Sequence, residues 1–253
     1  GALQRLATGN GGRGSDHAAA KLLNRMVPAA FFCRPEVADW LVVHAARTWI
    51  SGHYDDAHIY PMACLALATI PARDDYASGY RAARAALSAG ESGERGVETA
   101  RARHVFGLFN CHWFEPLEHG LAQAHEAQDA LLRSGELEFA CYTFFTSQAA
   151  LLETGNNLEE LETENRRALA FAGKTGNRHA LESYAAFRHL LDVLTAPESA
   201  EVEDVPRSNP MAACFHHMTR AMAACFFGDD EALARHTAEA ARLSPYITGF
   251  YPV

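Results

Sequence analysis

Apolar residues recur along most of this chain with the spacing of one face of an α-helix. In segment 136–152 they fall at positions 137, 140, 141, 144, 151 and 152, and only Gln148 interrupts the face. Segments 116–132 and 157–172 repeat the pattern, and no stretch alternates with period two for long enough to indicate a strand. A helix with one apolar stripe is stable only when that stripe packs against a neighbour. The sequence therefore predicts an all-α fold.

A short turn recurs between the helical segments. Gly135, Gly155 and Gly176 are about 20 residues apart, each is followed by Glu or Asn, and Gly228 is followed by Asp. Glycine just past a helix end adopts the left-handed conformation that terminates the helix, and the next residue favours a new N-terminus. One helical hairpin then takes about 40 residues, which is typical of helix-hairpin repeats. We expect a TPR-like α-solenoid of stacked antiparallel helix hairpins.

The chain divides into a short lead and a long helical part. We expect a flexible Gly-rich lead at 1–16 and a single helical-repeat array at 17–253, with an exposed acidic loop at 196–208 and a truncated C-terminal end. Helices are expected at 17–27, 35–51, 56–70, 74–89, 93–113, 116–133, 136–153, 157–173, 177–195, 209–227 and 230–243.

Composition excludes several classes of protein. The 253 residues are 49% hydrophobic and 21% charged, which is typical of a globular chain. A net charge of −9 argues against nucleic acid as a partner, and no apolar run approaches the length of a membrane span. The six cysteines are scattered without CxxC spacing, so we expect buried, reduced thiols in a cytoplasmic protein.

Histidines and paired aspartates are the first candidates for a metal site. None of the 13 histidines has the HExxH spacing, and the adjacent His216 and His217 should point about 100° apart on a helix. The pairs that begin at Asp55, Asp74 and Asp229 lack DDxxD spacing and stand at predicted helix starts, where aspartate is favoured electrostatically. We therefore expect no metal ligands.

Signatures of catalysis are equally weak. The Gly-rich segment 9–14 lacks the Lys and Ser/Thr of a phosphate loop, and no GxSxG motif occurs. A Cys–His dyad could form in space, but the sequence favours no one pairing. We expect no catalytic or cofactor-binding residue and no cofactor.

Aromatic residues are the better candidates for function. Most should pack between helices, while a minority could line a concave groove that holds a peptide or a small molecule. The candidates for groove or packing positions are Phe109, Trp113, Tyr142 and Phe145. Trp113 is interpreted first as a core anchor and second as a ligand contact.

Four motifs, in order, resemble the helical-repeat region of large bacterial multidomain signalling proteins. They are GYRAARAAL (79–87), HVFGLFNCHWFEPLEHGLAQAHEA (104–127), SGELEFACYTFFTS (134–147) and GNNLEELETE (155–164). In that family such a region follows an AAA/STAND-type predicted ATPase, often between a Ser/Thr kinase domain and GAF and sensor histidine kinase domains. The resemblance covers about residues 17–195. It implies a module that senses or transmits a signal to flanking enzymatic domains.

The sequence thus favours a non-catalytic interaction or ligand-sensing repeat module of a larger ATP-dependent signal-transduction protein. Its partners would be another protein or flanking domains of the same chain, with neither nucleic acid nor a membrane involved. Two alternatives stay open. One is a free-standing all-α enzyme with a Cys/His- or Asp-lined pocket, and the other is a pure self-association module that forms a homodimer.

Overall fold

The computed structural model describes residues 14–52, 55–93, 96–155, 157–196, 209–247 and 249–250. Within these ranges all regular structure is helical, which confirms the all-α prediction. The predicted Gly-rich lead falls outside them except for residues 14–16, which begin a helix, and so does the acidic loop apart from residue 196. None of the described helices is both long enough and apolar enough to span a membrane.

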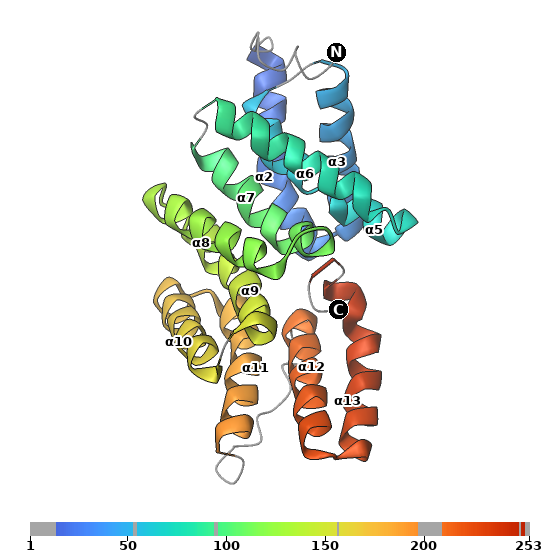
Figure 1. The fold of residues 1–253 in the computed structure, drawn as a ribbon. Coiled ribbons are helices and arrows are strands. Elements are labelled where there is room, and N and C mark those ends of the chain that lie inside the picture. Colours follow the sequence, from blue (N-terminus) through green and yellow to red (C-terminus); the bar gives the residue numbers. More distant parts are fainter. Residues whose placement is uncertain are drawn as a thin grey trace. The chain divides into compact units, whose positions relative to one another are not determined.

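The chain forms two compact units, residues 1–140 and 141–253, and the division falls within helix α9 (Figure 1). The first unit contains α2 (Gly14–Cys33), α3 (Pro35–Ile50), η1 (Asp56–His58), α4 (Ile59–Ala63), α5 (Ala66–Arg73), α6 (Tyr76–Ser92), α7 (Gly96–Phe109), η2 (Cys111–Trp113) and α8 (Leu117–Arg133). Helix α9 spans Leu137–Thr154. The second unit continues with α10 (Leu158–Thr175), α11 (Arg178–Thr195), α12 (Pro210–Phe227), α13 (Asp230–Leu243) and η4 (Ser244–Ile247).

Two of the predicted glycine turns explain where α10 and α12 end. Gly176 and Gly228 cap α10 and α12 with φ of 68° and 70°. The next residues, Asn177 and Asp229, accept backbone N–H groups of α11 and α13 as N-caps. Asp55 and Asp75 cap η1 and α6 in the same way. One member of each of these aspartate pairs therefore has the helix-capping role that its position in the sequence indicates.

Three helix predictions are wrong in detail. The segment 93–113 is α7 followed by the separate 3₁₀ turn η2 rather than one helix. The segment 56–70 is three elements rather than one helix, because Leu65 and Leu67 bond three residues back and so interrupt the α-helical ladder. Helix α2 continues through Pro28 to Cys33 instead of ending at residue 27. A proline removes one hydrogen bond from the helix, and burial of the flanking Val27 and Ala30 offsets that loss.

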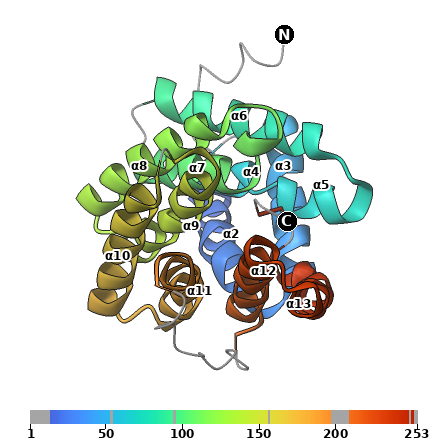
Figure 2. The same ribbon diagram turned by 60° about the horizontal axis from the view of Figure 1, so that its bottom comes forward.

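The five residues of α4 are all buried. This short helix packs against α2, α3, α6 and α7, so the first unit is assembled around α4 as well as along the chain. In the second unit each helix packs on the next, from α10 to α13. Figure 2 looks down α11, α12 and α13 and shows these three helices side by side.

Gly79 sets the distance between α5 and α6. A Cβ atom at this position would lie 2.8 Å from the Cα atom of Ala66, which is backbone and cannot rotate away. We expect Gly79→Ala to lower the free energy of unfolding by about 1–2 kcal/mol, because the overlap exceeds the gain in helix propensity.

Gly173→Ala is the matched control, since a Cβ atom there meets nothing within 4 Å. It should stabilise the chain by about 0.5 kcal/mol, because only helix propensity changes. Urea unfolding followed by circular dichroism measures both variants. Equal changes in the two variants would contradict the close approach of α5 and α6.

Candidate functional site

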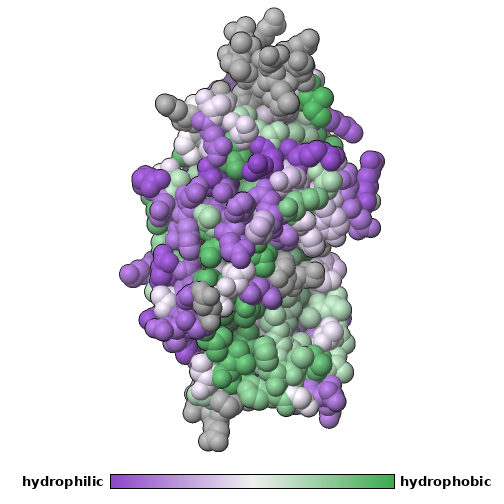
Figure 3. All heavy atoms as spheres, in the orientation of Figure 1, coloured by the Kyte–Doolittle hydropathy of each residue, from purple (hydrophilic) through white to green (hydrophobic). Residues whose placement is uncertain are grey.

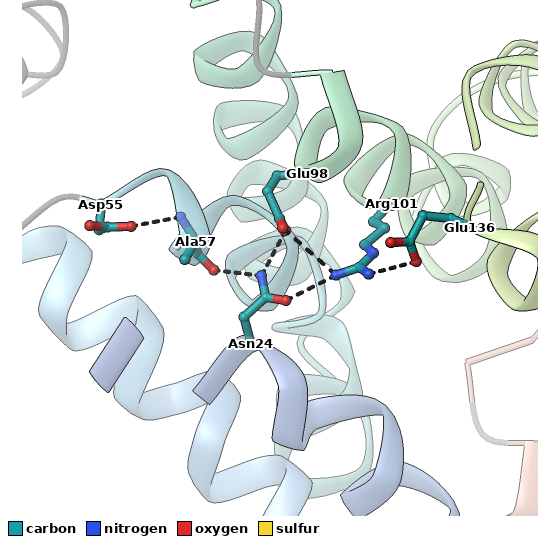
Figure 4. Close-up of polar contacts among 6 residues, drawn as sticks. All are labelled: Asn24, Asp55, Ala57, Glu98, Arg101 and Glu136. Atoms are coloured by element: carbon teal, nitrogen blue, oxygen red, sulfur yellow. Dashed lines mark hydrogen bonds and ion pairs between the residues drawn. The ribbon is translucent and has the colours of Figure 1, made fainter. Parts of the chain in front are cut away.

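Arg101 lies at the centre of a polar network inside the first unit (Figure 4). Its guanidinium donates to Oδ1 of Asn24 at 3.1 Å and to Oε2 of Glu136 at 2.6 Å, and it lies 3.7 Å from Glu98. The Arg101 side chain is only 4% exposed, whereas those of Glu98 and Glu136 are 25% and 24% exposed. A charge buried this deeply needs partners, and Arg101 has three.

The network extends from Asn24 to the start of η1. The Nδ2 atom of Asn24 donates to the carbonyl of Ala57 and to Oε2 of Glu98, both at 2.7 Å. Asp55 accepts the backbone N–H of Ala57 at 2.9 Å. Burial raises the pKa of Glu98, against the lowering effects of the Asn24 hydrogen bond and the Arg101 charge. These contacts tie α2, η1 and α7 to the residue that precedes α9, so the network cross-links the first unit.

Apart from the two glutamates, the groups around the guanidinium are apolar or neutral. Arg101 lies over the ring of Phe139 at 4.8 Å, and the rings of Tyr60 and His104 lie 5.4 and 6.2 Å from the same ring. Burial lowers the pKa of His104 to about 4, so its imidazole is neutral at pH 7. The interior of the first unit therefore holds a paired charge in an apolar shell, an arrangement suited to stability.

A group of aromatic side chains lies at the surface of the same unit. We call Tyr76, Tyr80, Trp113 and Phe114 the aromatic ledge. The rings of Tyr76 and Trp113 are 4.5 Å apart, and those of Tyr80 and Phe114 are 4.6 Å apart. Trp113 is 36% exposed and Phe114 is 48% exposed, whereas the two tyrosines are half-buried. The ledge joins the start of α6 to the turn between α7 and α8.

Glu115 holds the Tyr80 ring of the ledge in place. Its Oε1 accepts the hydroxyl of Tyr80 at 2.6 Å, and its Oε2 lies 3.1 Å from Nδ1 of His119. Arg84 lies 3.7 Å from the same carboxylate. Burial raises the pKa of Glu115, but the hydrogen bonds from Tyr80 and His119 outweigh that effect and hold the pKa below its ordinary value. Glu115 is thus ionised at pH 7 and orients the Tyr80 ring.

Cys111 lies beside this carboxylate, where a Cys–His dyad could be sought. Its thiol donates to Oε2 of Glu115 at 3.7 Å and therefore faces a carboxylate. Burial and the Glu115 charge raise the pKa of Cys111 to about 12, so the thiol stays protonated. A protonated thiol is a poor nucleophile. The geometry here favours an anchored surface over a nucleophilic centre.

The four sequence-predicted aromatics lie in three different environments. Phe109 and Phe145 are packing residues, 4% and 5% exposed. Tyr142 is half-buried, and its ring lies 6.1 Å from that of Phe145. The interpretation of Trp113 as a core anchor is wrong, because this residue lies at the surface. Helix α7 ends at Phe109, and the tighter 3₁₀ turn that follows rotates Trp113 away from the face that buries Phe109.

Sequence reasoning missed the other three members of the ledge. Tyr80 and Trp113 do stand in motifs that carry the family resemblance, the Gly-Tyr at 79–80 and the His-Trp at 112–113. The sequence motifs could therefore have pointed to these two residues. The pairing of these rings depends on contacts between α6 and the turn that follows α7, which periodicity does not reveal.

The cysteines follow the prediction of buried thiols only in part. Four cysteines are buried, but Cys33 and Cys225 are exposed, and none of the six, all of which the structure describes, forms a disulfide. Among the residues that the structure describes, no group of three or more His, Cys, Asp or Glu side chains could hold a metal ion.

Apolar side chains also reach the surface of the second unit. Figure 3 shows apolar surface over the helices α11 to α13. The large exposed apolar residues of α11 to η4 are Leu181, Phe226, Phe227 and Tyr246. Among the ring contacts of the described residues, none of these four side chains pairs with an aromatic ring as the ledge residues do. The ledge is therefore the candidate interaction site.

Comparisons of this chain with protein families, curated proteins and solved structures gave no significant match.

Proposed function

We propose that this chain is a non-catalytic, TPR-like interaction and regulatory module of a larger cytoplasmic, ATP-dependent signal-transduction protein. The aromatic ledge is its contact site for a protein segment, supplied by a partner or by a flanking domain. The observation that carries the proposal is that one ring of each of two aromatic pairs is exposed, while Glu115 holds Tyr80 by a hydrogen bond.

Aromatic residues at a surface are efficient binding groups. Trp, Tyr and Arg are enriched among the residues that dominate protein interfaces. The ledge contains two tyrosines and a tryptophan, and Arg84 lies 3.7 Å from Glu115, the residue that holds Tyr80. The Tyr80–Glu115 hydrogen bond restricts the ring before any partner arrives. Binding then costs less side-chain entropy, so more of the contact energy appears as affinity.

The helix arrangement supports the repeat part of the proposal. In the second unit α10, α11, α12 and α13 pack consecutively, and short glycine turns join α10 to α11 and α12 to α13. Packing of each helix on the next is expected of stacked helical hairpins in repeat proteins, and it supports this part of the proposal. The resemblance of the four motifs to signalling proteins supports the parent context, in which flanking enzymatic domains would receive the signal.

Photo-crosslinking from the ledge tests the proposal. Replacing Phe114 with p-benzoylphenylalanine, in the protein expressed in its own host, places a reactive ketone at the exposed edge of the ledge. We expect crosslinks to one discrete protein segment, identified by mass spectrometry. Adding Trp113→Ala should remove most of the crosslinked product, because the neighbouring ring is part of the same contact.

Ile50 is the matched control position, since it is also apolar and is 79% exposed, but stands apart from the ledge at the end of α3. The same photoreactive residue at position 50 should not give the segment captured at position 114. Equal capture at both positions would contradict a specific site. Capture of a second copy of this chain alone would favour the self-association alternative instead.

A further inference from the structure

Four histidines form a row across three consecutive helices of the second unit. His189 belongs to α11, His216 and His217 to α12, and His236 to α13. The rings of His189 and His216 stack with centroids 6.2 Å apart, and those of His216 and His217 meet edge to face at 5.6 Å. His217 and His236 complete the row, with ring centroids 5.2 Å apart. The row therefore runs from α11 to α13.

The contact between His217 and His236 depends on where their protons are. Their Nδ1 atoms are 2.9 Å apart, so one must carry a hydrogen and the other must present a lone pair. A doubly charged pair would place two N–H groups against each other at this distance. The hydrogen bond would then be lost, and two positive charges would repel across the α12–α13 contact.

Burial and charged groups of both signs act on the row. Burial is the largest cause that lowers the pKa of each of the four histidines, and it lowers that of His216 to about 3. Arg220 of α12 lowers all four further. The other charged groups that act on the row are Asp192 of α11, Asp229 at the N-cap of α13, and Arg235, Glu239 and Arg242 of α13.

We propose that the histidine row is a proton-operated latch: acidification breaks the Nδ1–Nδ1 hydrogen bond between His217 and His236 and releases α13 from α12. Both helices belong to the second unit, so this latch stands independently of the proposed binding function of the ledge. The short turn at Gly228 gives α13 a place to pivot.

The direction of the pH effect follows from the lowered pKa values. In the closed state α13 packs on α12, and in the open state it has separated. At a pH above the ordinary histidine pKa, the histidines are neutral in both states and α13 stays on α12. As the pH falls below that value, the open state binds protons more readily than the closed state. Stability of the α12–α13 contact is therefore lost on acidification and retained at neutral and higher pH.

The accessibility of Cys214 reports whether α13 has separated from α12. It is 1% exposed, and its thiol donates to the carbonyl of Ala240 in α13 at 3.5 Å. Labelling with 4,4′-dithiodipyridine, located by mass spectrometry, measures its accessibility. Cys64 is also 1% exposed and lies in the first unit, so it serves as the internal reference. We expect the Cys214/Cys64 labelling ratio to rise about tenfold between about pH 7.5 and about pH 5.

The His236→Gln variant separates this latch from general acid sensitivity. Glutamine can hydrogen-bond to His217 in either protonation state but never carries a charge. In both His236→Gln and the reciprocal His217→Gln, the labelling ratio should therefore rise less than about threefold over the same pH range. The control His125→Gln removes an exposed histidine of α8 in the first unit and should behave like the unchanged chain.

Circular dichroism at neutral pH confirms that each variant is folded before labelling. A ratio that does not change with pH, or that rises equally in His236→Gln, would overturn the proposal. Zinc provides the remaining outcome. Stoichiometric Zn²⁺ binding at neutral pH that protects Cys214, and that His236→Gln abolishes, would replace the proton latch with a metal site.

Discussion

The Arg101→Met variant is expected to unfold with a free energy about 3 kcal/mol lower than that of the unchanged chain. Methionine fills similar space but leaves Glu98, Glu136 and Asn24 without the guanidinium that pairs them. Removing one partner of a buried charge network is costly because the others stay desolvated. We expect the low end of the usual range, because both glutamates are about one-quarter exposed and water can partly rehydrate them.

Arg103→Met on the same helix is the control. Arg103 pairs with Glu91 and Glu126, whose side chains are 49% and 59% exposed, so its loss should cost less than about 1 kcal/mol. All three tryptophans of the chain, Trp40, Trp49 and Trp113, lie in the first unit, so their fluorescence during urea unfolding reports on it. Equal losses in the two arginine variants would show that the buried network has no special role.

Phe145→Ala should lower the free energy of unfolding by about 4 kcal/mol. The Phe145 ring lies 4.9 Å from that of Tyr184 and 5.7 Å from that of Phe215, and Phe250 approaches at 5.8 Å. Truncation leaves a cavity inside this cluster, because three rings around it cannot close the space together. A groove residue would instead lose binding and keep its stability, so the variant separates the two interpretations of Phe145.

Tyr142→Ala provides the comparison three residues earlier on α9. Tyr142 is half-buried, and we expect a loss of about 1 kcal/mol because water refills the space that the ring leaves. Far-UV circular dichroism during urea unfolding measures both variants, since the second unit contains no tryptophan. A change at Phe145 no larger than that at Tyr142 would be inconsistent with its position in the core.

The elements that sequence predicted well depend on local chemistry. Helical periodicity and the Gly-Asn and Gly-Asp turns involve residues within a few positions of one another, so the helix-ending roles of Gly176 and Gly228 are predictable from sequence alone. Helix α4 could not be assigned in this way. Its five residues carry Pro61 and no periodic polar face, because α4 is buried on all sides.

The sites depend on contacts between distant residues. Asn24 and Arg101 are separated by 77 positions, and His217 and His236 by 19. Nevertheless, Arg101 shares a helical stripe with the buried Val105 and Leu108, where an arginine is out of place. A charged residue on an apolar face indicates a buried partner, although the sequence does not say which partner.

The binding role of the aromatic ledge is the central claim, and an affinity measurement tests it most directly. The protein segment captured from position 114 should bind the purified Trp113→Ala variant at least about tenfold more weakly than the unchanged chain. The free energy of unfolding of the variant should fall by only about 1–2 kcal/mol, because Trp113 is 36% exposed but packs on Tyr76, and circular dichroism shows that the variant is folded before binding is measured. Ile50→Ala should bind like the unchanged chain. Equal affinity for the Trp113→Ala variant and the unchanged chain would contradict the account.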